Sequence, residues 1–286
     1  MRVLITGAGG QLGDAIIDGY TGTADVLPLS HAQLDITDDR AVRHHISTFK
    51  PDAIINCASY NHVDRAEEEP VIALNVNAVG LQTLARATAE VGARLVHYST
   101  DFVFDGRSSF PYTEDDVPNP ESVYAVSKLL GEWFAREAPG SLVLRVESLF
   151  GGRNAKSSID WIVEAIATGH ERQVFTDRTV SPSYVVDVAA ATRALLERGE
   201  SGLFHCVNTG FCTWYELAAE IARQLGQPLR VVPISVKNTP LPAPRPQFAA
   251  LSNAKLQRVG IEMPSWQDAL SRHLRVQSQN CRPASS

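Results

Sequence analysis

Hydrophobic positions in the first half of the chain follow two alternating patterns. Short continuous apolar runs, which we expect to form strands, cover residues 2–6, 25–29, 52–57, 94–99 and 141–147. Longer segments in which apolar residues recur every three to four positions, as they do in helices, cover residues 11–19, 38–49, 70–91 and 122–137. Apolar strands that alternate with helices indicate an α/β fold, in which helices cover both faces of a parallel sheet.

The pattern loosens after residue 150. We expect further helices at residues 158–168, 184–197, 213–225 and 265–274, and short apolar pieces between them at residues 173–175, 203–207 and 229–232. The proline-rich segment 238–246 is expected to be an extended loop, because proline lacks a backbone donor and fixes φ.

Composition and charge exclude several classes of protein. The chain has 286 residues, of which 44% are hydrophobic and 20% charged, so it is neither disordered as a whole nor fibrous. With a net charge of −6, the chain lacks the basic character of nucleic-acid binders and of segments that bind anionic membranes. No long apolar run or signal-like N-terminus is present, which predicts a cytoplasmic protein. The four scattered cysteines predict neither a disulfide framework nor a zinc site.

A glycine-rich turn follows the first expected strand. Gly7 would let the chain turn off the strand, Gly10 would let the backbone approach a pyrophosphate, and Gly13 would let the next helix pack closely. The N-terminus of that helix offers N–H groups and a positive dipole end to a phosphate. A tight turn without a ligand is the alternative, but the position between strand and helix favours a dinucleotide site.

These features predict how the chain is organised. We expect a Rossmann-type, doubly wound parallel sheet that binds a dinucleotide over residues 1–150, with some elements of residues 176–210 returning to it. A smaller C-terminal substrate lobe would cover residues 151–275. Residues 276–286 are mostly polar and would form a disordered tail.

The segment after the second expected strand usually decides between NADH and NADPH. Ser30 stands there next to His31, without a carboxylate or an arginine, so that either cofactor is compatible. Asp35, before the next helix, is a second candidate for contact with the cofactor. The alternative is that Asp35 caps that helix together with Thr37.

Tyr124 and Lys128 are four residues apart in an expected helix, so their side chains share one face. An ammonium group beside a phenol lowers its pKa, and the phenol can then exchange a proton with a carbonyl or alcohol oxygen. Such a pair on an isolated helix would more often be a surface feature, but the glycine turn favours catalysis. Ser99 or Thr100, at the carboxyl end of the fourth strand, could bind the reacting oxygen or merely cap a loop.

These segments together resemble the extended short-chain dehydrogenase/reductase superfamily, and most closely the dTDP-4-dehydrorhamnose reductases. The similarity extends over about residues 1–275 and includes Ser99-Thr100-Asp101-Phe102-Val103-Phe104, Asn56-Cys57-Ala58-Ser59-Tyr60 and Val207-Asn208-Thr209-Gly210. The resemblance implies NADPH or NADH as cofactor, a nucleotide-sugar substrate and a homodimer in some members. The implied reaction reduces the 4-keto group of a nucleotide-linked deoxysugar, most simply dTDP-4-dehydro-L-rhamnose.

The resemblance also implies roles for single residues. Tyr124 would give the proton, Thr100 would polarise the carbonyl oxygen, and Lys128 would tune Tyr124 and hold the nicotinamide ribose. The implied substrate contacts are Thr100, Asp101 and Ser148. In addition to Ser30, the implied cofactor contacts are Gly7, Gly10, Gln11, Leu12, Asp35, Ile36, Ala58, Ser59, Tyr60, Tyr124 and Lys128.

Departures from the family pattern concern the sugar and a metal. Where the family tends to read Arg-Thr-Ser-Trp, this chain reads Arg145-Val146-Glu147-Ser148. A reductase for a different deoxysugar is therefore an alternative, with Phe102, Phe150 or Tyr184 replacing the missing aromatic side chain. Ala15 stands where some members have a glutamate that helps hold a metal between subunits, so no metal is expected.

Two further classes remain open. A non-catalytic regulatory subunit, which would resemble the beta subunit of methionine adenosyltransferase, would keep the fold and act by binding a partner. An epimerase or dehydratase would share the superfamily. A dehydratase usually has an acidic pair after the hydroxyl residue, and here Asp101 is followed by Phe102, which disfavours it.

Overall fold

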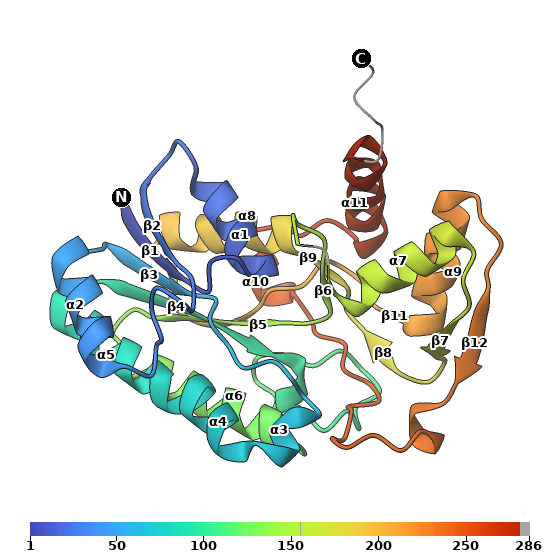
Figure 1. Cartoon of the computed structure of the whole chain (residues 1–286), viewed down its shortest axis with the longest axis horizontal. Helices are drawn as coiled ribbons and strands as arrows, with labels where there is room; N and C mark the ends of the chain where they lie inside the picture. The colour runs from blue at the N-terminus through green and yellow to red at the C-terminus, as the bar shows by residue number, and fades with distance from the viewer. Residues whose placement is uncertain (155, 281–286) are drawn as a thin grey trace.

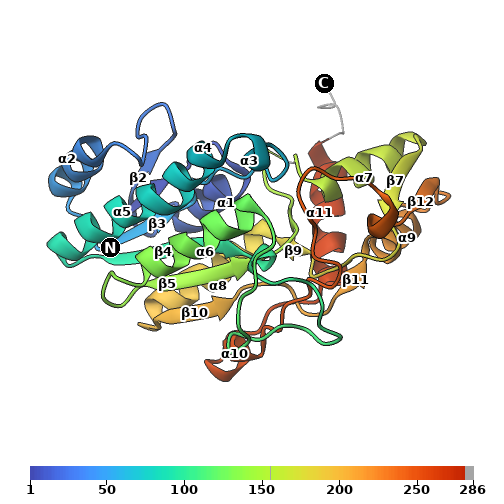
Figure 2. The ribbon, with the colours of Figure 1, turned by 90° about the horizontal axis from the view of Figure 1, so that it is seen from below.

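The computed structural model describes residues 1–154 and 156–280, which form a parallel α/β sheet and a smaller second lobe (Figure 1, Figure 2). The sheet has six strands in the order β10-β5-β4-β3-β1-β2, and every pairing is parallel. Its members are β1 (Arg2–Thr6), β2 (Asp25–Leu29), β3 (Ala53–Asn56), β4 (Arg94–Thr100), β5 (Leu142–Val146) and β10 (Gly202–His205). The prediction of a doubly wound parallel sheet is confirmed, and the strand order reverses between β1 and β3.

Helices cover both faces of this sheet, which explains why its strands are continuously apolar. Successive residues of a strand point to opposite faces. Ile5 of β1 therefore packs with α1 (Gln11–Tyr20) and α8 (Val185–Glu197), whereas Leu4 packs with α2 (Asp39–Phe49) and α5 (Gly80–Val91).

The expected long helix over residues 70–91 contains a wider turn. It consists of α4 (Pro70–Leu74), a π-helical turn (Asn75–Val79) and α5. A π turn inside a helix inserts an extra residue and often marks a functional site. This turn buries Asn77, whose role is described below.

The second lobe has its own apolar core, built mainly from α7, α9 and α11. Its elements are β6 (Leu149–Phe150), α7 (Ser158–Thr168), β7 (Arg172–Phe175), β8 (Thr179–Val180), β9 (Ser183–Tyr184), β11 (Cys212–Thr213), α9 (Trp214–Leu225), β12 (Val231–Ile234) and α11 (Trp266–Asn280). Two-residue strands such as β6 and β9 carry no period of their own, so the sequence pattern did not predict them. The proline-rich segment is irregular apart from Asn238, which ends a short 3₁₀ turn.

Two elements from the second half of the chain return to the first lobe. β10 pairs with β5 at the edge of the sheet, and α8 packs on α1. Among the helices, α3 (Arg65–Glu68) and α10 (Ala254–Arg258) were not expected from the sequence, and α6 (Val123–Ala135) is shorter than expected.

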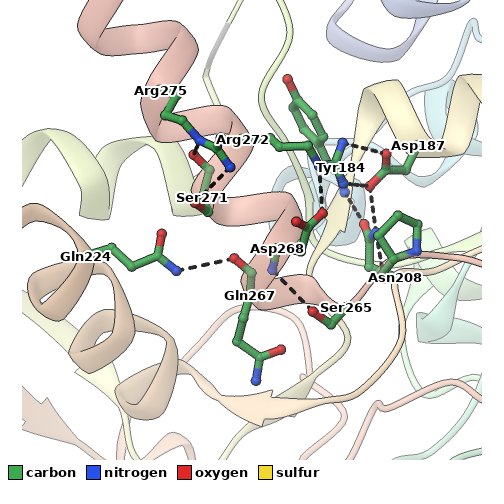
Figure 3. A network of polar contacts seen from close by, with 11 residues as sticks. Tyr184, Asp187, Asn208, Gln224, Ser265, Gln267, Asp268, Ser271, Arg272 and Arg275 are labelled. Atoms are coloured by element: carbon green, nitrogen blue, oxygen red, sulfur yellow. Dashed lines mark hydrogen bonds and ion pairs between the residues drawn. The ribbon is translucent and has the colours of Figure 1, made fainter.

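A polar network joins α11 to α8 (Figure 3). Arg272 donates two hydrogen bonds to the Asp187 carboxylate, at 2.8 and 2.6 Å. The Asn208 side-chain amide donates to the same carboxylate at 2.7 Å, and its Oδ1 accepts from the Tyr184 N–H at 2.7 Å. A two-point arginine–carboxylate contact fixes both partners, so this junction sets the position of the second lobe against the sheet.

The C-terminal end differs from the prediction. Helix α11 continues to Asn280, so residues 276–280 belong to a helix and not to the expected disordered tail. Leu274 is the last buried apolar residue of this helix, and beyond it Gln277 contacts His273 of the same helix at 3.0 Å, so the helix continues past its apolar pattern. Residues 281–286 of that expected tail lie outside the described residues. No helix in the described ranges is long and apolar enough to cross a membrane.

Candidate active site

The glycine turn lies where the strand order reverses, between the carboxyl ends of β1 and β3. Gly7 has a φ of 76°, and a Cβ there would lie 2.6 Å from the backbone of Cys57 and Ala58. A Cβ on Gly13 would collide with the carbonyl oxygen of Gly7. Only glycine therefore allows the turn to approach both the β3 end and the helix. This is the geometry that a dinucleotide-binding turn needs.

The N-terminus of α1 is left open to a ligand. Among the described residues no side chain caps it, since its N-cap residue is Gly10. Gln11 directs its amide to the Gly151 carbonyl at 2.8 Å and to Asp160 at 3.1 Å, and Leu12 is buried in the core. The first turn of α1 can therefore offer a pyrophosphate backbone N–H groups, while its side chains hold the two lobes together.

The end of β2 carries Ser30 close to the same turn. The Ser30 N–H and hydroxyl both bind the Gln33 side-chain oxygen, at 2.9 and 2.8 Å. The Ala8 N–H donates to the Leu29 carbonyl at 3.1 Å, which ties the glycine turn to this strand end. Ile36 is buried and packs under Gly80 of α5.

Asp35 does not cap the next helix. Its carboxylate accepts from the Thr37 N–H at 2.9 Å and from the Thr37 hydroxyl at 2.8 Å, and these hydrogen bonds lower its pKa. The cap of α2 is Asp38, which accepts from the Ala41 N–H at 3.0 Å. The alternative interpretation of Asp35 as a helix cap is therefore wrong, because the helix starts later in the chain.

The loop after β3 is held by Asn77, a residue that the sequence analysis missed. Asn77 accepts from the Tyr60 N–H at 2.9 Å and from the Ser59 hydroxyl at 3.0 Å. Its amide donates to the Tyr60 carbonyl and to the Ser127 hydroxyl of α6, both at 2.9 Å. One buried amide thus joins the loop to the helix that carries Tyr124. The sequence feature that could have identified Asn77 is its position four residues before Leu81, which puts a polar residue on the apolar face of the helix.

Tyr124 and Lys128 both lie on α6, four residues apart as predicted, and the structure shows that both are buried. The Lys128 Nζ donates to the Tyr98 carbonyl at 2.6 Å and to the Ser59 hydroxyl at 3.4 Å. Burial lowers the pKa of Lys128 to about 8, because a charged amine is disfavoured away from water. The Lys128 amine therefore adjoins the loop that Asn77 holds.

The pKa of the Tyr124 phenol is raised, mainly by burial and then by the charge of Asp101. A hydrogen bond with Thr100 acts in the opposite direction. Lys128 is not among the groups that shift the pKa of Tyr124, and its amine donates to the Tyr98 carbonyl. The pKa of Tyr124 is raised in this structure, and the expected lowering by Lys128 is not seen.

The structure separates the two candidate hydroxyls of β4. Ser99 donates to Glu132 at 2.5 Å inside a buried network, whereas Thr100 donates to Asp101 at 2.9 Å on the side of Tyr124. Successive strand residues face opposite ways, so only one of the two can reach the site. Thr100 also accepts from the Phe102 N–H at 3.2 Å, so the expected loop cap exists as well.

Two charged residues that the sequence analysis did not assign to the site lie beside Asp101. Glu147 follows β5 and is 2% exposed, and Arg178 precedes β8 and is 9% exposed. Burial raises the pKa of Glu147 well above its ordinary value and that of Asp101 to about 6, while the positive charge of Arg178 opposes both shifts. The sequence feature that could have identified Glu147 as a site residue is a carboxylate at the end of an apolar strand, at a position where the family tends to have serine.

Ser148 and the nearby aromatic rings shape the same edge. Ser148 has a φ of 43°, which is in the left-handed region that side chains other than glycine rarely adopt. Phe102 packs edge-on against Tyr124, with ring centres 5.6 Å apart. Phe150 and Tyr184 instead stack on each other at 5.4 Å in the core of the second lobe. Of the three rings expected to replace the missing aromatic side chain, Phe102 therefore adjoins the site.

Comparison with known proteins gives matches along nearly the whole chain. The family model described as RmlD substrate binding domain matches residues 1–278. A dTDP-4-dehydrorhamnose reductase of Mycobacterium tuberculosis is 40% identical over 284 residues, which cover 94% of this chain and 91% of that protein. A probable dTDP-4,6-dihydroxy-2-methyloxan-3-one 4-ketoreductase of Streptomyces antibioticus is 36% identical over 276 residues, covering 94% and 93%.

A solved structure agrees with these matches. The crystal structure of a Bacillus anthracis dTDP-4-dehydrorhamnose reductase in complex with NADP is similar with a TM-score of 0.92 and 33% identity, covering 96% of this chain and 99% of that chain. By sequence and by fold, the chain belongs to the dTDP-4-dehydrorhamnose reductase family, within the extended short-chain dehydrogenase/reductase superfamily.

Proposed function

We propose that this protein catalyses the NAD(P)H-dependent reduction of the 4-keto group of a nucleotide-linked deoxysugar, with dTDP-4-dehydro-L-rhamnose as the first candidate. The observation that carries the proposal is the meeting of Thr100, Tyr124 and Lys128 at the carboxyl ends of the strands, next to the glycine turn. Ligands of open α/β sheets bind at this edge. The printed activities of the relatives support the same reaction.

Each group at this edge has one part in the reaction. The backbone N–H groups of the first turn of α1 bind the pyrophosphate, and the loop of Ala58, Ser59 and Tyr60 adjoins the nicotinamide half. Lys128 binds the nicotinamide ribose from its position beside Ser59. The bound NADPH or NADH supplies the hydride, and the protein supplies placement and the proton.

Tyr124 is the proton donor in this proposal. The raised pKa of its phenol keeps it protonated at neutral pH, which is the form that an acid catalyst needs. Thr100 is beside the phenol and can bind the same carbonyl oxygen. Asp101 and Ser148 then border the sugar, from the ends of β4 and β5.

A different deoxysugar is the second candidate, because Ser148 leaves a gap where the family tends to have tryptophan. An aromatic wall against a sugar contributes about 1–3 kcal/mol. If the native sugar fills the gap, Ser148→Trp lowers kcat/KM for it. If Ser148→Trp instead raises kcat/KM for dTDP-4-dehydro-L-rhamnose, that sugar is the substrate and the case for another is lost.

The decisive experiment follows the oxidation of NADPH and NADH with a set of dTDP-4-keto sugars and identifies each product. We expect turnover with at least one sugar and a preference between the two cofactors of less than about 30-fold, the size of one charge-assisted hydrogen bond. Tight cofactor binding without turnover of any sugar would contradict the proposal and favour a regulatory subunit.

The domain bounds, the cellular location and the oligomeric state stay predictions. Residues 1–150, together with α8 and β10, would form the dinucleotide-binding domain, and residues 151–275 would complete the substrate lobe. The location would be the cytoplasm. A homodimer is compatible with the family and is tested by measuring the molar mass in solution.

A further inference from the structure

Asp101 and Glu147 emerge side by side from two neighbouring strands. In the parallel register of β4 and β5, Thr100 pairs with Val146, and Asp101 and Glu147 are the next residues of these two chain segments. Neighbouring strands are about 4.8 Å apart. The two carboxyl groups therefore leave the same edge of the sheet at adjacent positions, and both are buried.

Each of these carboxyl groups has one oxygen with a partner and one without. Asp101 Oδ1 accepts from the Thr100 hydroxyl at 2.9 Å, and Glu147 Oε2 accepts from the Ser181 N–H at 2.7 Å. Within the described ranges, Asp101 Oδ2 and Glu147 Oε1 are buried without any hydrogen-bond partner. Buried polar atoms rarely lack a partner. Two neighbouring carboxyl groups can satisfy each other only when one of them carries a proton.

The surrounding charges favour one proton on the pair. Arg178 faces both carboxyl groups, whereas the nearby Arg245 is paired with Asp64 at 2.8 Å. The other titratable groups that face the pair are Tyr124 on α6 and Cys212 on β11, and burial raises the pKa of each, so both are neutral. Two carboxylates beside one arginine would leave a net buried negative charge. A single shared proton makes the set neutral, as buried charges require.

We propose that Asp101 and Glu147 share one proton at neutral pH, and that this proton replenishes Tyr124 through the Thr100 hydroxyl after each reduction. The shared proton is independent of the proposed function, whereas its transfer to Tyr124 rests on that function. The hydrogen bonds connect Tyr124 to Thr100 and Thr100 to Asp101, and Glu147 is the neighbouring carboxyl group on which the charge of Asp101 acts. The raised pKa of Glu147 agrees with its being the resting holder of the proton.

The proton transfers balance at each step. Tyr124 gives its proton to the sugar oxygen and becomes a phenolate. The Thr100 hydroxyl passes its proton to the phenolate and takes one from Asp101, which has received the proton of Glu147 and turned its carboxyl group. The pair is then doubly ionised, and it takes one proton from water when the product leaves.

The shared proton is tested on the protein without substrate, by infrared spectroscopy in D2O at pH 7.5. A protonated carboxyl group gives a carbonyl band above the amide band. We expect this band in the wild type and its loss in Glu147→Gln, because Asp101 alone beside Arg178 ionises. Glu114→Gln is the matched control: Glu114 also accepts a backbone N–H, that of His205 at 2.7 Å, and should leave the band unchanged. A wild type without the band, or a band that persists in Glu147→Gln, overturns the proposal.

The relay is tested by the pH dependence of turnover. In Glu147→Gln, Asp101 can still carry a proton at pH 6 but not at pH 8. We therefore expect kcat near that of the wild type at pH 6 and about tenfold lower at pH 8, with KM unchanged at both. A purely structural role would lower kcat equally at both pH values, and that result overturns the relay. If the wild type reduces no keto sugar, the proposed function fails, while the infrared band still tests the shared proton.

Discussion

Two sets of buried charges lie on the same pair of strands, and they are built in opposite ways. Inside the sheet, Arg145 of β5 donates to both oxygens of Glu132, each at 2.8 Å, and Ser99 of β4 adds a third donor at 2.5 Å. At the carboxyl edge, Asp101 and Glu147 each keep an oxygen without a partner among the described residues. Asp101 lies two positions after Ser99 at the end of β4, and Glu147 lies two positions after Arg145 at the end of β5.

This difference in pairing indicates that the first set stabilises the fold and that the second set takes part in the chemistry of the site. In the Glu132–Arg145 set every carboxylate oxygen is occupied, so that set can hold the fold together but has no capacity for a ligand or a proton. The Asp101–Glu147 set has oxygens that are buried, uncompensated and next to Tyr124. Proteins tend to violate the rules of polar satisfaction at functional sites. Incomplete pairing therefore points to the site more directly than charge or burial alone.

The largest effect is expected on the chemical side of this comparison. Tyr124→Phe removes the proton donor and keeps the ring that packs against Phe102, so kcat should fall by about 10²–10⁴-fold. Cofactor affinity and the free energy of unfolding should change little. Steady-state kinetics, cofactor titration and denaturation with urea measure the three quantities. A kcat within threefold of the wild type would remove Tyr124 from its role.

The next effect is expected on the structural side. Arg145→Met leaves the buried carboxylate of Glu132 without its partner, which should lower the free energy of unfolding by about 3–5 kcal/mol. Glu147→Gln, by contrast, keeps the contact with the Ser181 N–H. It should change the free energy of unfolding by less than about 1 kcal/mol. Urea denaturation of both variants checks the pair of values. Equal losses in the two variants would abolish the distinction between the sets.

A smaller effect concerns Lys128, which lies on α6 one turn before Glu132. Its pKa is about 8 in the folded chain, against an ordinary value of 10.5. Between these two pH values the unfolded chain binds the proton and the folded chain does not, so the stability of the wild type rises with pH. The difference in unfolding free energy between wild type and Lys128→Met should therefore move in favour of the wild type by roughly 2–3 kcal/mol from pH 7.5 to pH 10.5. A flat difference would show that the amine is not buried as described.

The smallest effect is expected at Ser148. Glycine adopts a φ of 43° without strain, so Ser148→Gly should stabilise the protein by about 0.5–1 kcal/mol. Ser148→Ala, which keeps the strain and loses the hydroxyl, is the matched control. The two variants are compared by thermal and urea unfolding. If alanine stabilises as much as glycine, the hydroxyl and not the backbone is responsible.

The sequence by itself determined the order of strands and helices, the glycine turn and the shared face of Tyr124 and Lys128. Each of these depends on spacing within one segment, and backbone geometry translates such spacing directly into structure. The same reasoning could not decide between Ser99 and Thr100, because an apolar strand buried on both faces shows no alternation that tells which face meets the site.

Only the tertiary structure decided which distant residues meet. Asn77 reaches the loop of Ser59 and Tyr60 because a π turn directs it there. Asp101 and Glu147 become partners because β4 and β5 are neighbours in parallel register. Strand order and register depend on how all the layers pack together, and no local period in the chain encodes them.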